Sequence, residues 1–189
     1  IWFVGGLSYK IVGGVLAVAI PTITVSIILI VTKGKSFLEP YQYKRVMSWL
    51  QPDKFPMDAR QQQNSIMAIG SGQLFGKGLN NTGAASIKSG DYIGEIHTDF
   101  IFSIAGEELG FIGCLIIIGL LILITIECML IAKKSKELTG RLIATGMGTL
   151  IVAQSFVNIG VTTGFLPNTG LPLPFVSYGL TSLWSLYIG

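Results

Sequence analysis

Charged residues are scarce in this chain: they make up 12% of its 189 residues, whereas half of the residues are hydrophobic. The mean hydropathy is +0.65. This composition excludes an ordinary soluble domain, in which about a quarter of the residues carry a charge. The formal net charge is only +3 and the basic residues are spread along the sequence, so no nucleic-acid partner is expected.

Histidine and cysteine are almost missing. The single histidine, His97, cannot form a metal site alone, and we interpret it as a hydrogen-bonded orienting residue in a loop. The two cysteines, Cys114 and Cys128, lie too far apart along one apolar segment to form a disulfide with each other. No zinc or redox motif is present. The sequence therefore predicts no metal ligand set.

Long apolar segments dominate instead. Leu109 to Ile126 contains no formal charge, and about 20 residues rising 1.5 Å each match a hydrocarbon core of roughly 30 Å. We predict an all-α, polytopic integral membrane protein: a helical bundle with a large extracytoplasmic loop that contains short amphipathic helices. Because the sequence starts at Ile1, without an initiator Met or a signal peptide, it is interpreted as a fragment of a larger membrane protein.

The connectors set the expected topology. Residues 133–141 contain four basic residues and one acid, which places this connector in the cytoplasm. The expected segments are the end of a truncated transmembrane helix with a cytoplasmic connector (1–10), a transmembrane helix (11–32), the extracytoplasmic loop (33–99), a transmembrane helix (100–132), the cytoplasmic loop (133–141), a transmembrane helix (142–165), a second extracytoplasmic loop (166–177) and the start of the last transmembrane helix (178–189).

The large outer loop has structure of its own. Apolar side chains recur at helical spacing over 41–50, which predicts an amphipathic helix on the membrane surface. Pro52 and Pro56 end it, and a second short helix is expected over 61–69. Long ordered loops usually carry function.

Asp99 stands directly before an apolar span. A carboxylate there can cap the helix, because it satisfies free backbone N–H groups and suits the positive end of the helix dipole. It can equally act as a general base toward a sugar hydroxyl, or hold a divalent cation beside a phosphate. The local sequence leaves these three roles open.

Two acids follow within the same span. Glu107 and Glu108 lie roughly 12 Å along the helix from Asp99, and neighbouring positions point about 100° apart. Only one of them can share a face with Asp99, and Glu107 is better placed. The pair is expected to bond a neighbouring helix or to line a watery cavity. The glycines at 106, 110 and 113 form a small-residue edge that favours close helix packing.

Two irregular segments complete the motifs. Ala68 to Gly83 is rich in glycine, and its Lys77, together with Arg45 and Arg60, predicts an anion site on the outer side. Gly164 to Gly179 contains three prolines between two spans. Such irregular backbone at membrane depth is tolerated only where protein or a cavity surrounds it.

Three motifs together resemble a known family. The sequences HTDFIFSIAGEELGFIG (His97–Gly113), SIMAIGSGQLFGKGL (Ser65–Leu79) and NIGVTTGFLPNTGLPLPFVSYG (Asn158–Gly179) are similar to those of the shape, elongation, division and sporulation (SEDS) proteins, which include RodA, FtsW and SpoVE. The resemblance implies a peptidoglycan glycosyltransferase in the bacterial cytoplasmic membrane. Such an enzyme would polymerise lipid II, a disaccharide-peptide on undecaprenyl pyrophosphate, at the extracytoplasmic face. Its expected partners are membrane lipid and a class B penicillin-binding protein.

The resemblance also implies roles for residues. Asp99 matches the essential acid of the family and would be the catalytic base when a 4-hydroxyl attacks an α-linked sugar pyrophosphate, giving a β-1,4 linkage by inversion. Positive charge would stabilise the leaving pyrophosphate, with Arg45 the first choice. The substrate-binding residues predicted on these grounds are Arg45, Arg60, Lys77, His97, Glu107 and Glu108. A divalent cation, Mg or Mn, is the one cofactor considered, and no cluster of oxygen ligands in the sequence supports it.

Other functions compete with this interpretation. A flippase or transporter of the lipid-linked precursor would place ionisable groups on broken helices near the bilayer midplane. A non-catalytic activator of the penicillin-binding protein would tolerate replacement of Asp99. A relative of O-antigen ligase shares outer-facing chemistry but does not explain the three motifs. Among the roles in elongation, division and sporulation, the sequence of residues 68–78 slightly favours elongation.

Overall fold

The computed structural model describes residues 17–19, 21–22, 25, 39–78 and 99–178. Within this part of the chain every regular element is helical, in agreement with the predicted all-α class. The expected segment 1–10, most of the expected segments 11–32 and 178–189, and His97 lie outside the described residues.

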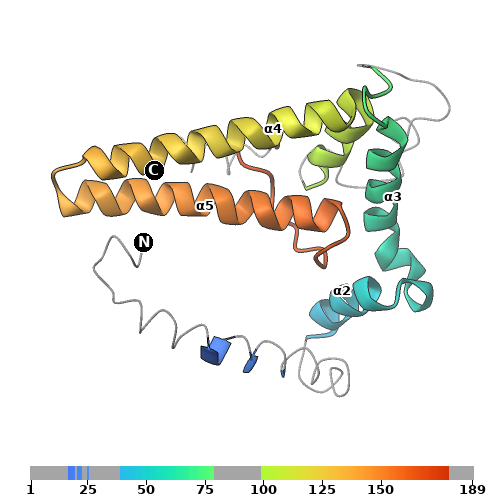
Figure 1. The fold of residues 1–189 in the computed structure, drawn as a ribbon. Coiled ribbons are helices and arrows are strands. Elements are labelled where there is room, and N and C mark those ends of the chain that lie inside the picture. Colours follow the sequence, from blue (N-terminus) through green and yellow to red (C-terminus); the bar gives the residue numbers. More distant parts are fainter. Residues whose placement is uncertain (1–16, 20, 23–24, 26–38, 79–98, 179–189) are drawn as a thin grey trace.

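Helices α4 (Ile101–Lys134) and α5 (Leu138–Thr162) form an antiparallel hairpin (Figure 1). Both are long and apolar enough to cross a membrane. They differ slightly from the expected spans, 100–132 and 142–165. Hydropathy marks only the part that suits hydrocarbon, whereas backbone hydrogen bonding continues past it into Lys133 and Lys134, whose charges suit the helix C-terminus.

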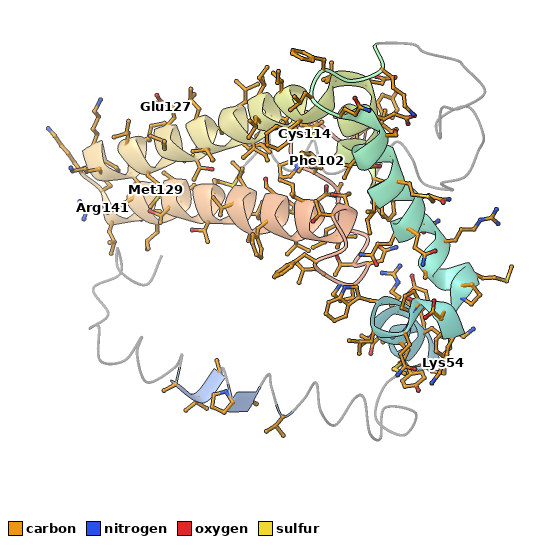
Figure 2. The ribbon with its side chains drawn as sticks, turned by 45° about the vertical axis from the view of Figure 1, so that its right-hand side comes forward. Lys54, Phe102, Cys114, Glu127, Met129 and Arg141 are labelled. Carbon is orange, nitrogen blue, oxygen red and sulfur yellow. The ribbon has the colours of Figure 1, made fainter. Side chains whose placement is uncertain are left out.

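The core of the hairpin lies between the two helices. Phe102, Cys114 and Leu121 of α4 pack with Ile151 of α5 and with Leu173, which belongs to the segment after α5. Figure 2 shows Phe102 and Cys114 where α4 faces α5. The segment after α5 therefore folds back onto the hairpin rather than leaving it.

The outer segment forms α2 (Pro40–Leu50), a 3-10 turn (Pro52–Lys54) and α3 (Pro56–Gly72). Each begins with a proline, which fits the first helical turn because its missing N–H would have no partner there. The second helix of this segment is thus longer than the expected 61–69. Helix α3 crosses the end of the α4–α5 hairpin, and α2 lies at the far end of α3 (Figure 1).

Side chains of α2 and α3 donate hydrogen bonds to backbone carbonyls at the C-terminal end of α5 and just after it. Gln62 Nε2 donates to the backbone O of Val161 and of Leu166 at 2.8 and 2.7 Å, and Ser65 Oγ donates to Thr162 O at 2.9 Å. Trp49 Nε1 donates to Gly164 O at 2.9 Å. The last carbonyls of a helix lack partners within it. These bonds supply such partners and fix the outer segment against α5.

Helix α4 is broken at Gly110. This residue has φ 69° and ψ −166°, a non-helical conformation between two helical pieces. The glycine therefore does more than form the small-residue packing edge predicted from the sequence. Gly106 does meet α3 closely, since a Cβ built on it would lie 3.0 Å from the Ile69 side chain.

Candidate functional site

Asp99 and Arg45 converge on one turn. Asp99 is half-buried and lies just before α4, whereas Arg45 comes from α2. A Cβ built on Gly170, in the segment after α5, would lie 3.3 Å from Asp99 Oδ2 and 3.7 Å from Arg45 Nη1. Gly170 has φ +71°, a conformation that favours glycine. A carboxylate and a guanidinium from distant parts of the chain thus approach the same point beside the backbone of Gly170.

Arg45 is held in place from two sides. Its Nη1 donates to Asn168 O at 3.2 Å, and its Nη2 donates to the Tyr41 hydroxyl one turn earlier on α2. The guanidinium lies over the Tyr41 ring, 4.4 Å from the ring centroid, a cation–π contact. Because a guanidinium has five N–H donors, these contacts orient the group and leave donors for an anion.

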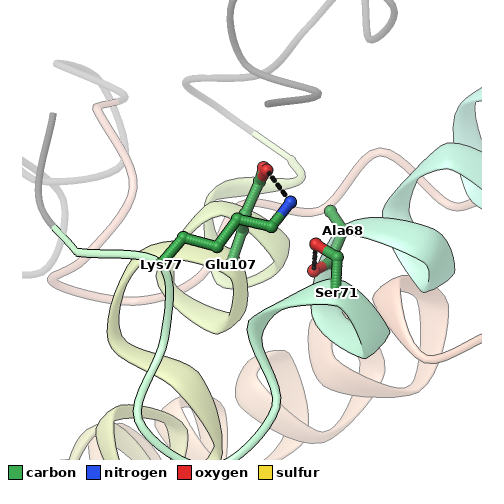
Figure 3. Close-up of polar contacts among 4 residues, drawn as sticks. All are labelled: Ala68, Ser71, Lys77 and Glu107. Carbon is green, nitrogen blue, oxygen red and sulfur yellow. Dashed lines mark hydrogen bonds and ion pairs between the residues drawn. The ribbon is translucent and has the colours of Figure 1, made fainter. Parts of the chain in front are cut away.

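Lys77 and Glu107 form a second pair (Figure 3). Lys77 Nζ lies 2.9 Å from Glu107 Oε1, and the two side chains are 26% and 4% exposed. The backbone N–H of Lys77 also donates to Glu107 O at 2.9 Å. The sequence placed Lys77 toward a pyrophosphate, and the structure brings it to Glu107. The sequence predicts that Glu107 bonds a neighbouring helix or lines a watery cavity; its partner Lys77 instead lies in the segment that follows α3.

The remaining predicted site residues are Arg60, Glu108 and His97. Arg60 is exposed on α3, and the ion pair found among the described residues does not include it. Glu108 is half-buried, and its carbonyl accepts a hydrogen bond from Gly78 N at 3.1 Å. His97 is outside the described residues. Among the described residues, Asp99 and Arg45 therefore approach the same turn, whereas Lys77 and Glu107 form a separate pair that joins the segment after α3 to α4.

Residues 73–78, which we call the strap, fill the break in α4. In an unbroken helix Phe111 N and Ile112 N would donate to the carbonyls of Glu107 and Glu108. Here they donate to Gln73 O and Leu74 O at 2.8 and 3.3 Å. The two freed carbonyls accept instead from the backbone N–H groups of Lys77 and Gly78. Four backbone bonds thus replace the two that the break removes.

Sequence reasoning missed the strap. Backbone polar groups inside an apolar layer must find partners, but no periodicity shows which distant segment supplies them. The available signal was the glycine content on both sides: Gly76, Gly78 and Gly110 all have positive φ. The strap therefore places residues 73–78 of the glycine-rich segment beside α4.

We expect replacement of Lys77 to destabilise the protein more than replacement of its partner Glu107. Lys77→Met leaves a buried carboxylate without its cation and should lower the free energy of unfolding by roughly 3 kcal/mol. Glu107→Gln should lower it by only about 1 kcal/mol, because Lys77 is a quarter exposed and can reach water. Thermal melting of the two single variants and the double variant in detergent measures the coupling. Additive effects would contradict the pair.

Comparison with known proteins identifies the family of the chain. The family model described as a cell cycle protein, covering FtsW, RodA and SpoVE, matches residues 1–189. A probable peptidoglycan glycosyltransferase FtsW from Buchnera aphidicola subsp. Schizaphis graminum is 40% identical over 185 residues, 96% of this chain and 51% of that protein. The protein of the same name from Haemophilus influenzae is 45% identical over 147 residues, 76% of this chain and 36% of that protein.

A solved structure shows the same fold. It is described as showing structural coordination of polymerization and crosslinking by a peptidoglycan synthase complex, and it matches with a TM-score of 0.65 at 30% identity, over 98% of this chain and 48% of the other. The chain thus spans about half the length of these relatives or less. Since the family model matches the whole of it, the chain belongs to the FtsW/RodA/SpoVE family of membrane proteins.

Proposed function

We propose that the full-length protein is a peptidoglycan glycosyltransferase that polymerises lipid II, with Asp99 as the general base and Arg45 as the cation for the leaving pyrophosphate. The observation that carries this proposal is the approach of Asp99 Oδ2 and Arg45 Nη1 to Gly170 from two different segments. The names of the relatives support the reaction class, and they support division rather than the elongation role that residues 68–78 slightly favour.

The chemistry needs one base and one cation. The acceptor's 4-hydroxyl attacks the anomeric carbon of an α-linked sugar pyrophosphate, and its proton passes to the Asp99 carboxylate. The bond from the anomeric carbon to the pyrophosphate oxygen breaks, and its electron pair leaves with the lipid pyrophosphate. A guanidinium matches phosphate oxygens through parallel N–H donors and stabilises the charge that develops on them. Attack from the opposite face gives the β-1,4 linkage.

A divalent cation is not needed for this assignment. Among the described residues no three His, Cys, Asp or Glu side chains gather in a group that would hold a metal ion. Within the described residues, the Asp99 carboxylate and the Arg45 guanidinium approach the same position beside Gly170, an arrangement that suits an anion better than a cation. We therefore assign no step to Mg or Mn.

The orientation follows from charge. Lys133 and Lys134 end α4, and Asp99 precedes it at the other end. The part of α4 after the break, residues 111–134, spans about 36 Å, enough to separate the two ends of α4 by the hydrocarbon core of a bilayer. If the basic end faces the cytoplasm, the Asp99 site lies on the extracytoplasmic face of a multi-pass protein, where a class B penicillin-binding protein would work beside it. The match to a synthase complex supports such a partner.

The broken helix bears on the transporter alternative. Discontinuous helices in transporters present free backbone groups to their substrate. In α4 the groups on both sides of Gly110 are bonded to the strap, so they are not available to an ion or a headgroup. The break therefore favours a fixed scaffold over a transport site.

A polymerisation assay tests the function. The full-length protein, purified in detergent with its penicillin-binding partner and supplied with lipid II, should produce glycan strands. Detergent contains no compartments, so a flippase would give no product. Absence of polymer under conditions in which the partner is folded and binds the protein would overturn the glycosyltransferase assignment.

A further inference from the structure

Asn158 of α5 makes two hydrogen bonds across the site. Its Nδ2 donates to Asp99 O at 2.8 Å and to Leu171 O at 2.6 Å. The side chain is 1% exposed. Both acceptors are backbone carbonyls, and only the amide nitrogen can donate to them, so the orientation of the amide is fixed by these contacts.

These two bonds connect the halves of the site. Asp99 O belongs to the residue whose carboxylate approaches Gly170, and Leu171 directly follows that glycine. The same turn accepts the hydrogen bond from Arg45 through Asn168 O, and Gly170 N donates to Asn168 Oδ1 at 3.2 Å. One side chain therefore joins the backbone at the carboxylate to the turn that holds the guanidinium.

The other atom of the amide argues against a purely stabilising role. Asn158 Oδ1 is buried and makes no hydrogen bond to any described residue. A buried acceptor without a partner is unfavourable. An amide present for stability alone is expected to satisfy both of its ends, whereas among the described residues this one uses only its donors.

We propose that Asn158 is a positioning residue for Asp99, acting through the backbone at Asp99 and at Leu171 without touching the substrate. The proposal rests on the proposed function, because the quantity it controls is the placement of the general base against Arg45. A shift of about 1 Å in a reacting group lowers a rate by about 100-fold, so loss of both bonds should affect turnover more than binding.

The test compares two buried substitutions on α5 in the full-length protein with its partner. Asn158→Asp keeps the shape and removes the donors. Thr162→Val is the matched control: the Thr162 side chain is 0% exposed, and its hydroxyl donates only to carbonyls of its own helix, at Asn158 and Ile159. Asn158→Asp should lower kcat for lipid II polymerisation at least 10-fold and leave KM within twofold. Thr162→Val should change neither by more than twofold.

Several results would overturn the proposal. Among them are an unchanged kcat in Asn158→Asp, a rise in KM alone, and an equal loss in Thr162→Val. If Asn158→Asp does not accumulate folded, Asn158→Ser removes the amide without introducing a buried charge and should show the same loss of kcat. Failure of both variants to fold would also overturn the proposal, because the amide would then serve the bundle as a whole. A wild-type protein without polymerase activity would instead overturn the proposed function.

Discussion

Asp99→Asn should abolish glycan polymerisation while leaving the protein folded and inserted in the membrane. The substitution keeps the shape of the side chain but removes the group that accepts the proton. A positioned general base contributes about 10²- to 10⁴-fold to a rate, so we expect at least a roughly 100-fold loss of strand synthesis from lipid II. Gel analysis of the polymer, together with the amount of protein in the membrane fraction, measures both parts of this expectation.

Two further variants sharpen that result. Asp53 is an exposed acid of the outer segment, away from α4, and Asp53→Asn should leave polymerisation unchanged. Arg45→Lys keeps the charge but loses the planar pair of donors, so its activity should fall between those of wild type and Asp99→Asn. If Asp99→Asn polymerises lipid II like the wild type, the base is wrongly assigned. A non-catalytic activator of the penicillin-binding protein would then be favoured.

The helices of the hairpin could be predicted from the sequence because the thickness of the hydrocarbon layer dictates the length of an apolar run. The break in α4 could not. Gly110 stands in a continuous apolar pattern, and hydropathy contains no information about which carbonyl a backbone N–H will meet. The backbone N–H groups freed by the break donate to the carbonyls of Gln73 and Leu74, which lie more than thirty positions earlier in the chain.

The same holds for the candidate site: its residue types could be predicted from the sequence, but their arrangement in space could not. Asp99 and Arg45 could be picked from motifs, since each residue type suits a step of the chemistry. Their approach to Gly170 depends on the tertiary structure, because three segments meet at the end of the hairpin. Lys77 illustrates the converse: a lysine in a glycine-rich turn suits a phosphate, and only its position beside the buried Glu107 reveals an ion pair.

Gly110→Ala should unfold the strap, and it is the largest effect on stability that we expect. Gly110 has φ 69° and ψ −166°, a region open essentially to glycine alone, where another residue is strained by about 1–3 kcal/mol. A Cβ there would also lie 2.3 Å from Gly76 N and 2.7 Å from Leu74 O. These are backbone atoms that cannot turn away, so the strap must move. Including the lost hydrogen bonds, we expect a destabilisation above roughly 3 kcal/mol.

Gly119 offers the matched control on the same helix. No heavy atom of a neighbouring segment lies within 4 Å of a Cβ built there, and Gly119 lies inside regular helix. Gly119→Ala should therefore be neutral or stabilise the protein by up to about 1 kcal/mol, because alanine favours the helix. Thermal melting of both variants in detergent separates the two sites. If Gly110→Ala melted at the same temperature as Gly119→Ala, α4 would be able to close into a continuous helix. The backbone hydrogen bonds with the strap would then not be required for the fold.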